Sequence, residues 1–234
     1  MNPNEDKIVP ISIPGIHQAF YPYFIRKTGG KKIKVLDAGA GHGAFTKKLF
    51  DEGYEMGACD IFPEYYYYDK VPVKQADITK EIPFDDSSFD AIISLEVMEH
   101  IQDHSTFFAE AERVLRKDGK LFVSTPNILS LKSRIRFLFS GFFYSFTPLD
   151  HDRHDGLQHV SSLTLDQYNR LALIAGFEQA DYFFDKEQTT SKLWLWLCPF
   201  LWLYCKLKKT TMLHNTYGLL TGRILFMMFR AKKG

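Results

Sequence analysis

Aspartates and glycines near the start of the chain have the residue types and spacing of a ligand-binding loop. The stretch VLDAGAGHG runs from apolar residues into Asp37 and then places Gly39, Gly41 and Gly43 at alternate positions. Glycines in such a loop permit positive φ and let a ligand lie against bare backbone. A helix that follows would offer free N–H groups to the same ligand. A lone glycine pattern is weak evidence, so by itself the loop indicates only a nucleotide-like cofactor.

The spacing of this loop differs from that of dinucleotide-binding loops. It reads D-x-G-x-G-x-G, whereas the nicotinamide-binding fold carries G-x-G-x-x-G. The carboxylate of Asp37 precedes the glycines, where it would repel a pyrophosphate but suit a cationic amino-acid group. A nicotinamide dehydrogenase is therefore a weak alternative.

Two further acids follow the next apolar runs. Asp60 ends the run YEMGACD, and Asp77 lies in VPVKQADI. An acid at the end of the second strand can accept hydrogen bonds from both ribose hydroxyls, and open α/β sheets bind ligands at the carboxyl ends of their strands. Asp77 could accept from an adenine amino group. The three acids together predict one ligand crevice.

The elements that must position these acids alternate between strand-like and helix-like patterns. Unbroken apolar runs that alternate with amphipathic helices favour a mostly parallel sheet covered on both faces. We therefore expect a doubly wound α/β fold with a seven-stranded sheet in one domain, 1–234. Thr164 and Gln167 have capping-box spacing. The expected strands lie in 32–41, 54–60, 71–78, 89–97, 120–127, 177–185 and 222–233, and the expected helices in 42–53, 104–119 and 161–177.

Several of these motifs together resemble the class I S-adenosylmethionine-dependent methyltransferases. They are VLDAGAGHGAF, ACDIFPE, QADITKEIPFDDSSFDAIISLEVMEHI and RVLRKDGKLFVSTPN. The EVMEH stretch is similar to the subgroup of ubiquinone-biosynthesis and glycan-cluster O-methyltransferases. The resemblance implies S-adenosyl-L-methionine as cofactor. It implies cofactor contacts at Asp37, Gly39, Gly41, Gly43, Asp60, Ile61, Asp77, Ile78, Leu95 and Glu96.

Transfer to a hydroxyl would need a nearby base, and histidine is the first candidate. His159, in GLQHVSS, matches a motif that faces the acceptor pocket in related methyltransferases, and His100, in EVMEHI, is the second candidate. Glu96, Glu99 and His100 could instead bind one divalent ion, or Glu99 and His100 could orient a loop and a helix start. The contiguous cluster DHDRHD, 150–155, is rich in ligand types but is expected to be solvated. We expect no metal.

Composition sets the broad class. The formal net charge is +1 and 45% of the residues are hydrophobic, which fits a globular core and argues against a nucleic-acid partner. Three cysteines without metal-ligand spacing favour a reducing compartment. No secretion signal is evident at the N-terminus. These features predict a cytoplasmic protein, associated in one interpretation with the inner face of the membrane.

Two apolar inserts interrupt the α/β pattern. The first, 128–150, could form a lid over the acceptor or an extra helix on the core. The second, 192–215, holds LWLWLCPFLWLYCKLKK. Its apolar run is shorter than the roughly 20 residues that a membrane span needs, and Pro199 interrupts it. It could pack on the sheet, pack against a second subunit in a homodimer, or lie at a membrane surface with tryptophans at headgroup level. We favour peripheral membrane contact through 134–146 and 193–209.

These observations lead to one main hypothesis. The chain is expected to be a methyltransferase, O-directed, that acts on a small-molecule or lipid-linked acceptor, such as a glycan or quinone precursor, at the membrane surface. The alternative is a non-catalytic module that binds S-adenosylmethionine, or that interacts with a membrane, and keeps the fold without the chemistry.

Overall fold

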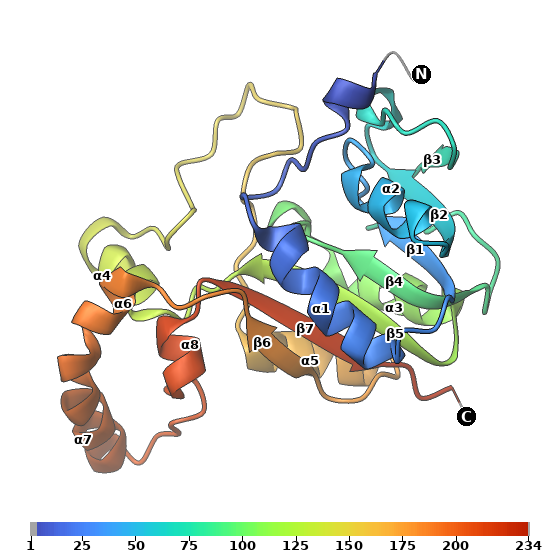
Figure 1. Cartoon of the computed structure of the whole chain (residues 1–234). Coiled ribbons are helices and arrows are strands. Elements are labelled where there is room, and N and C mark those ends of the chain that lie inside the picture. Colours follow the sequence, from blue (N-terminus) through green and yellow to red (C-terminus); the bar gives the residue numbers. More distant parts are fainter. Residues whose placement is uncertain (1–3, 234) are drawn as a thin grey trace.

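A seven-stranded sheet forms the centre of the protein in the computed structural model, which describes residues 4–233 (Figure 1). The strand order is β3-β2-β1-β4-β5-β7-β6, and β7 is antiparallel to both of its neighbours. The doubly wound, mostly parallel seven-stranded fold predicted from the sequence is confirmed. The strands are β1 Lys34–Ala38, β2 Glu55–Asp60, β3 Val73–Gln75, β4 Phe89–Ser94, β5 Leu115–Pro126, β6 Asp181–Phe184 and β7 Ile224–Arg230.

Helices cover both faces of this sheet because adjacent strand residues point to opposite sides. Val35 and Ile93 pack with α1 and α2 in one apolar cluster, whereas Leu36 and Ile92 pack with α3 and α5 in another. The covering helices are α1 Ile16–Thr28, α2 Ala44–Asp51, α3 His104–Val114 and α5 Leu165–Ile174, and the short 3-10 turns are η1 Glu5–Lys7, η2 Pro63–Tyr65 and η3 Met98–His100.

Two boundaries differ from the expectation. The helix expected over 104–119 ends at Val114, and β5 begins at the next residue. Leu115 is buried and pairs with Phe89 of β4, so burial on the sheet outweighs the helix propensity of the polar residues that follow. Helix α1 has no counterpart in the expected elements, and Pro22 lies inside it. The capping box of α5, formed by Thr164 and Gln167, is confirmed.

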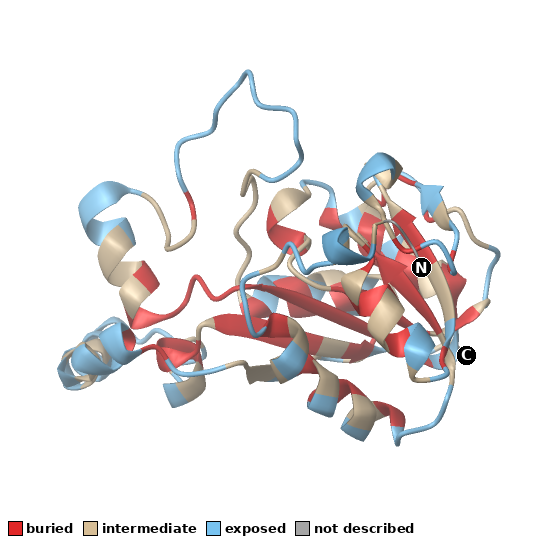
Figure 2. Ribbon diagram, turned by 45° about the horizontal axis from the view of Figure 1, so that its top comes forward, coloured by how far each residue is buried: buried red, intermediate tan, exposed pale blue. Residues whose placement is uncertain are grey.

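A second group of helices extends from the end of the sheet where the first apolar insert leaves β5 (Figure 1). It comprises α4 Leu131–Ser140, α6 Thr189–Leu193, η4 Leu195–Leu197, α7 Cys198–Lys208 and α8 Tyr217–Thr221. We call residues 131–141 and 189–221 the arm. Figure 2 shows that the sheet is mostly buried and that α7 is mostly exposed.

The tryptophan-rich insert is a series of short helices. Pro199 lies in the first turn of α7, where its missing N–H costs no hydrogen bond. The proline therefore begins a helix, and the interruption expected at this residue falls earlier, between α6 and α7. Within residues 4–233, no helix is long and apolar enough to cross a membrane.

Candidate active site

A cavity of about 1060 Å³ lies at the carboxyl edge of the parallel strands. Its wall combines the β1–α2 loop, the ends of β2, β3 and β4, the N-terminal segment 9–13 and part of the loop that precedes α5. The expected cofactor and catalytic residues all line it except Gly43. This edge is where an open α/β sheet binds its ligand.

The glycine loop brings backbone to the cavity wall. Gly39 has φ +84°, and a Cβ there would lie 2.6 Å from Cγ2 of Val97, so no larger residue fits without movement. Gly41 also has positive φ, and a Cβ there would lie 2.9 Å from Cδ1 of Ile11 in the N-terminal segment. Gly43, which precedes α2, does not line the cavity as expected. A Cβ on Gly43 would meet Tyr66 and Tyr68 at less than 3 Å.

Asp60 joins the end of β2 to the glycine loop. Its Oδ2 accepts a hydrogen bond from the backbone N–H of Gly41 at 2.8 Å, and its Oδ1 accepts from the N–H of Phe62 at 2.9 Å. A carboxylate has about four acceptor positions, so Asp60 can still accept from a ligand. Ile61, the next residue, is 48% exposed at the cavity.

Asp77 follows β3 and is held by local hydrogen bonds. Its Oδ1 accepts from the backbone N–H and the hydroxyl of Thr79, and Lys80 lies 3.1 Å from Oδ2. The Thr79 hydroxyl is the main reason that the pKa of Asp77 is lowered. Ile78 is buried beside it, which gives an apolar wall next to a charged acceptor.

Asp37 lies under the glycine loop and is buried. Its Oδ2 accepts a hydrogen bond from the Thr46 hydroxyl at 2.7 Å. Burial raises the pKa of Asp37 to about 6, and the nearby charge of Asp60 adds to the effect. Asp37 is thus a carboxylate that a cationic ligand group would stabilise.

The end of β4 turns sharply at the cavity. Glu96 has a positive φ of 56°, and its backbone N–H donates to the Ser124 hydroxyl, which in turn donates to Oε1 of Glu96 at 2.7 Å. Burial raises the pKa of Glu96 above its ordinary value. Leu95 lines the cavity next to it. The Glu96 side chain therefore pairs with β5 through Ser124.

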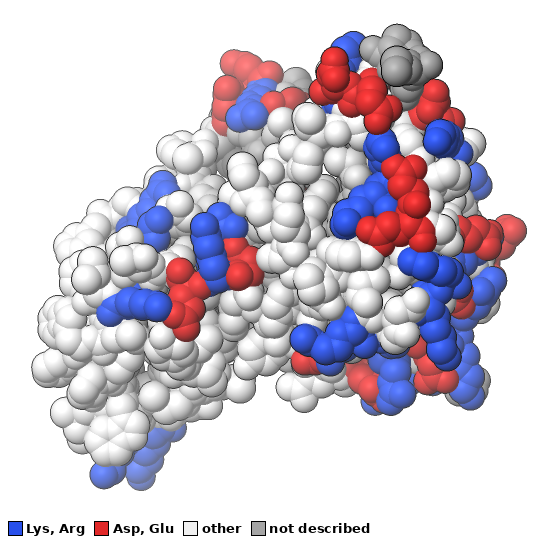
Figure 3. Space-filling model, in the orientation of Figure 1, with Lys and Arg blue, Asp and Glu red and all other residues white. Residues whose placement is uncertain are grey.

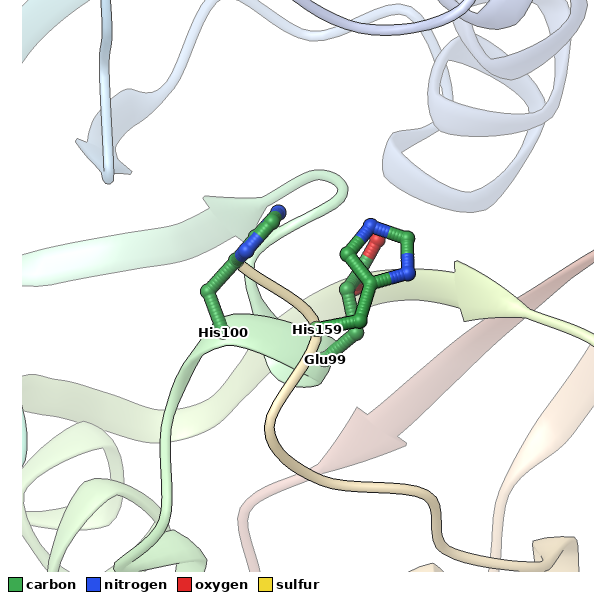
Figure 4. A group of neighbouring side chains, drawn as sticks. All are labelled: Glu99, His100 and His159. Carbon is green, nitrogen blue, oxygen red and sulfur yellow. The ribbon is translucent and has the colours of Figure 1, made fainter. Parts of the chain in front are cut away.

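Glu99, His100 and His159 lie close together in the lining of the same cavity (Figure 4). One nitrogen or oxygen atom from each lies within 4.8 Å of the others. The Nδ1 of His100 donates to the Gln158 carbonyl at 3.0 Å, since only a protonated nitrogen can bond to a carbonyl. The backbone carbonyl of Glu99 accepts from the N–H groups of Val160 and Ser161, which fixes the loop that carries His159.

Burial favours the neutral form of all three side chains. Burial lowers the pKa of His159 to about 4, with a smaller contribution from His100, and burial also lowers the pKa of His100. Burial raises the pKa of Glu99 well above its usual range. Within residues 4–233, Oε2 of Glu99 and Nδ1 of His159 are buried without a hydrogen-bond partner. Such atoms are available to a ligand.

Comparisons with known proteins fit this arrangement. Residues 36–123 match the family model described as "Methyltransferase domain". A probable S-adenosylmethionine-dependent methyltransferase of Mycobacterium tuberculosis is 28% identical over 166 residues, which are 69% of this chain and 54% of that protein. The ubiquinone biosynthesis O-methyltransferase of Pelagibacter ubique is 28% identical over 153 residues, 61% of this chain and 63% of that protein. The chain spans little more than half the length of its mycobacterial relative.

Solved structures give the same fold. A methyltransferase of Archaeoglobus fulgidus has a TM-score of 0.54 at 16% identity and covers 90% of this chain and 93% of its own. Phosphoethanolamine N-methyltransferase 2 of Haemonchus contortus, solved with S-adenosyl-L-methionine, has a TM-score of 0.55 at 16% identity over 96% of this chain and 54% of its own. Residues 36–123 are therefore a methyltransferase domain, and the chain has the fold and the sequence motifs of the class I S-adenosylmethionine-dependent methyltransferases.

The cavity lining fits S-adenosyl-L-methionine, the cofactor of this methyltransferase family. The wall offers the buried carboxyl of Asp37 for a cationic group and the strand-end acceptors of Asp60 and Asp77 for hydroxyl and amino donors. Ser12 Oγ and His42 Nδ1 are also buried at the cavity, and within residues 4–233 they have no hydrogen-bond partner. This set of acceptors matches a ligand that is cationic at one end and carries hydroxyl and amino donors at the other.

The cavity also holds a group of side chains that could bind a metal ion, and this group differs from the expected one. Glu99 and His100 belong to it, but its third member is His159. The Glu96 side chain instead accepts a hydrogen bond from the Ser124 hydroxyl of β5. Two imidazoles and one carboxylate are donor types that a divalent transition metal accepts.

Other residues line the cavity although no sequence motif predicts them. Residues 9–13 and His17 line the cavity, although nothing in VPISIPG marks a ligand contact. Their place depends on α1, whose first residues pack beside the glycine loop. The ring of His17 lies 4.9 Å from that of Phe45 in α2. In the DHDRHD cluster, only Asp155 reaches the cavity, and the cluster is exposed as expected.

Proposed function

We propose that the chain transfers a methyl group from S-adenosyl-L-methionine to a hydroxyl of a hydrophobic or lipid-linked acceptor, such as a glycan or quinone precursor, at a membrane surface. When bound, the cofactor supplies an electrophilic methyl group on a sulfonium and a neutral thioether leaving group. The protein therefore has to orient the acceptor, exclude water and handle one proton.

One observation carries this proposal: a single cavity joins the strand-end acids to His159. Asp37, Asp60 and Asp77 line the cavity and offer acceptors for the cofactor. His159 and His100 line the same cavity and are neutral imidazoles whose pKa values are lowered by burial. A neutral imidazole can accept a proton, so a base stands beside the place where the acceptor must enter.

Ring contacts and a hydrogen bond hold the histidine pair in place. The rings of His100 and His159 lie 4.9 Å apart, edge to face, and Phe146 packs against His159 at 5.2 Å. We assign His159 as the proton acceptor. The second histidine orients it, because the Gln158 carbonyl fixes the tautomer of His100.

O-direction is supported by the similarity to the ubiquinone biosynthesis O-methyltransferase and by the presence of this base. A hydrophobic acceptor is supported by the apolar and aromatic residues that lead from the arm toward the cavity. Phe137 stacks on Phe143 at 4.5 Å, and Phe143 contacts Phe146, which touches His159. We infer that the acceptor enters along this aromatic row, from the inner face of the membrane.

A radiolabel experiment tests the reaction. The purified full chain is incubated with methyl-labelled S-adenosyl-L-methionine and a lipid extract of the source cells, and products are examined by mass spectrometry for the addition of one CH₂. We expect label in the lipid fraction. A protein that binds the cofactor in calorimetry but labels no extract would be the non-catalytic module instead.

Two substitutions separate cofactor binding from chemistry. We expect His159→Ala to lower the rate of transfer by about 10²–10⁴-fold with unchanged cofactor affinity, while His154→Ala, in the exposed part of the same loop, has no effect. Asp60→Ala should weaken cofactor binding by at least about tenfold, because it removes charge-assisted hydrogen bonds. Glu64→Ala, four residues on and outside the cavity wall, is its control.

A further inference from the structure

The arm is built from two distant stretches of the chain that hydrogen bonds join. The backbone N–H of Lys132 in α4 donates to the Ser191 hydroxyl of α6 at 3.1 Å. The Arg134 guanidinium donates to Oδ1 of Asn215 at 2.6 Å and to the carbonyl of His214 at 2.5 Å. These bonds join α4 to α6 and to the loop after α7, so the two inserts present a common surface.

This surface exposes more large apolar side chains than a protein face in contact with water needs. Helix α7 buries only Cys205, although most of its residues are apolar. An apolar helix that buries almost nothing on its own protein indicates a partner that covers it. The large exposed apolar residues of the arm are Phe137, Leu138, Phe139, Leu193, Trp196, Phe200, Trp202, Leu203, Tyr204, Leu207, Met212, Leu213 and Tyr217.

The charges of the arm are all of one sign. Residues 131–141 and 189–221 contain no Asp or Glu. Because the whole chain has a formal net charge of only +1, the rest of the protein is net negative. Figure 3 shows the arm as a largely uncharged surface with Lys and Arg side chains at its tip. The basic residues of the arm are Lys132, Arg134, Arg136, Lys192, Lys206, Lys208 and Lys209.

A second copy of this chain fits the surface poorly. A twofold contact places the same patch of both copies together, and two arms would then bring basic residues against basic residues with no acid to pair them. A lipid surface meets both properties at once. Acyl chains cover apolar side chains, tryptophan and tyrosine favour the headgroup level, and lysines attract anionic headgroups.

We propose that the arm docks on an anionic lipid bilayer, with α7 lying in the interface and Lys206, Lys208 and Lys209 among the headgroups. Lys206 already lies 4.9 Å from the ring of Trp202, so a cation and an interfacial aromatic residue share one site on the helix. The net negative remainder of the protein would be repelled by the same bilayer, which leaves the arm as the contact. This inference rests on the proposed function in one respect: a hydrophobic or lipid-linked acceptor is the reason that the enzyme would need a membrane.

Vesicle flotation of the full chain tests the docking. We expect the protein to float with vesicles of phosphatidylcholine mixed with phosphatidylglycerol and to stay below vesicles of phosphatidylcholine alone. Raising the salt concentration should reduce the bound fraction, because exposed charges are screened. The combined variant Lys206→Gln, Lys208→Gln, Lys209→Gln should lose at least about tenfold in bound-to-free ratio. Its control, Lys31→Gln, Lys70→Gln, Lys117→Gln, removes exposed lysines outside the arm and should bind as the parent does.

The apolar half of the contact has its own variant. Trp196→Ser with Trp202→Ser should also abolish flotation, while calorimetry with S-adenosyl-L-methionine shows that the cofactor site is intact. Absence of flotation with anionic vesicles would overturn the inference. So would a dimer in analytical ultracentrifugation that the tryptophan variant dissociates, because a second copy would then cover the arm. Methyl transfer to a detergent-dispersed acceptor is measured in parallel, so that a failure of docking and a failure of the proposed reaction are told apart.

Discussion

Leu36 and Leu207 are the same residue type in two regions that use it differently. Leu36, in β1 beneath the glycine loop, is fully buried, whereas Leu207, in α7 of the arm, is 72% exposed. Around Leu36 the apolar residues hold strands in register and so fix the positions of the acids that follow them. Around Leu207 they face outward and stabilise little of the protein. Apolar residues thus build the site in one region and form a surface in the other.

The largest expected effect compares these two leucines directly. Leu36→Ala should lower the free energy of unfolding by about 2–5 kcal/mol, because it leaves a cavity in the core. Leu207→Ala should change it by less than about 0.5 kcal/mol. Urea denaturation followed by circular dichroism measures both. A loss of several kcal/mol at Leu207 would mean that the arm packs on the protein itself, and the comparison would fail.

Two glycines sharpen the description of the site region. Gly39 and Gly53 both have strongly positive φ, but a Cβ on Gly39 would meet Val97 at 2.6 Å, whereas none of the described residues lies within 4 Å of a Cβ on Gly53. Each alanine substitution should cost about 1–2 kcal/mol for the left-handed backbone. Gly39→Ala should cost more and also weaken cofactor binding. Equal losses in denaturation, with equal cofactor affinity in calorimetry, would show that the close approach at Gly39 has no role.

Much of the cofactor half of the site follows from the sequence, for a physical reason. Asp37, Asp60 and Asp77 each come at or just after the end of a strand that reads as an apolar run, and parallel strands place such ends at one edge. Local pattern and tertiary position therefore coincide there. The capping box at Thr164 is predictable in the same way, since its partners are three residues apart.

The rest depends on contacts that no local pattern encodes. His159 and Glu99 lie sixty positions apart and meet because backbone bonds from Val160 and Ser161 close on the Glu99 carbonyl. The turn at Glu96, with its positive φ, and the hydrogen bond from Ser124 to this side chain have no local sequence signal. The sequence leaves the surroundings of the arm open for a third reason. An apolar run has the same sequence pattern whether a core or a membrane covers it.

A smaller effect is expected from pH, and it comes from Asp37, a residue of the site and not of the arm. Burial raises the pKa of Asp37 from 3.8 to about 6, so the unliganded site is protonated below about pH 6. Cofactor affinity should therefore fall as the pH drops through 6, by at most about tenfold per pH unit. In calorimetry between about pH 5 and pH 8, Asp37→Asn should bind weakly with little pH dependence from this residue. Asp69→Asn, at an exposed position, should keep the parent profile.

The raised pKa of Asp37 changes stability with pH in the opposite direction from cofactor affinity. Because the folded protein binds the Asp37 proton more tightly than the unfolded chain does, this group makes the free energy of unfolding fall as the pH rises from 3.8 through about 6. Asp37→Asn should therefore stabilise the unliganded protein at pH 7 while it weakens cofactor binding. If the variant were less stable at pH 7, the hydrogen bond from Thr46 would outweigh the cost of burying the charge.

The smallest expected effect compares one substitution in both regions. Thr164 caps α5, and its backbone N–H donates to Oε1 of Gln167 at 2.8 Å. Thr210 is exposed just after α7. Thr164→Ala should lower the free energy of unfolding by about 1 kcal/mol, and Thr210→Ala by less than about 0.5 kcal/mol. Because α5 packs on the sheet, loss of its cap is felt in global unfolding. Equal losses at both positions would mean that the arm unfolds together with the sheet, and its apolar face would then need an explanation within the protein's own core.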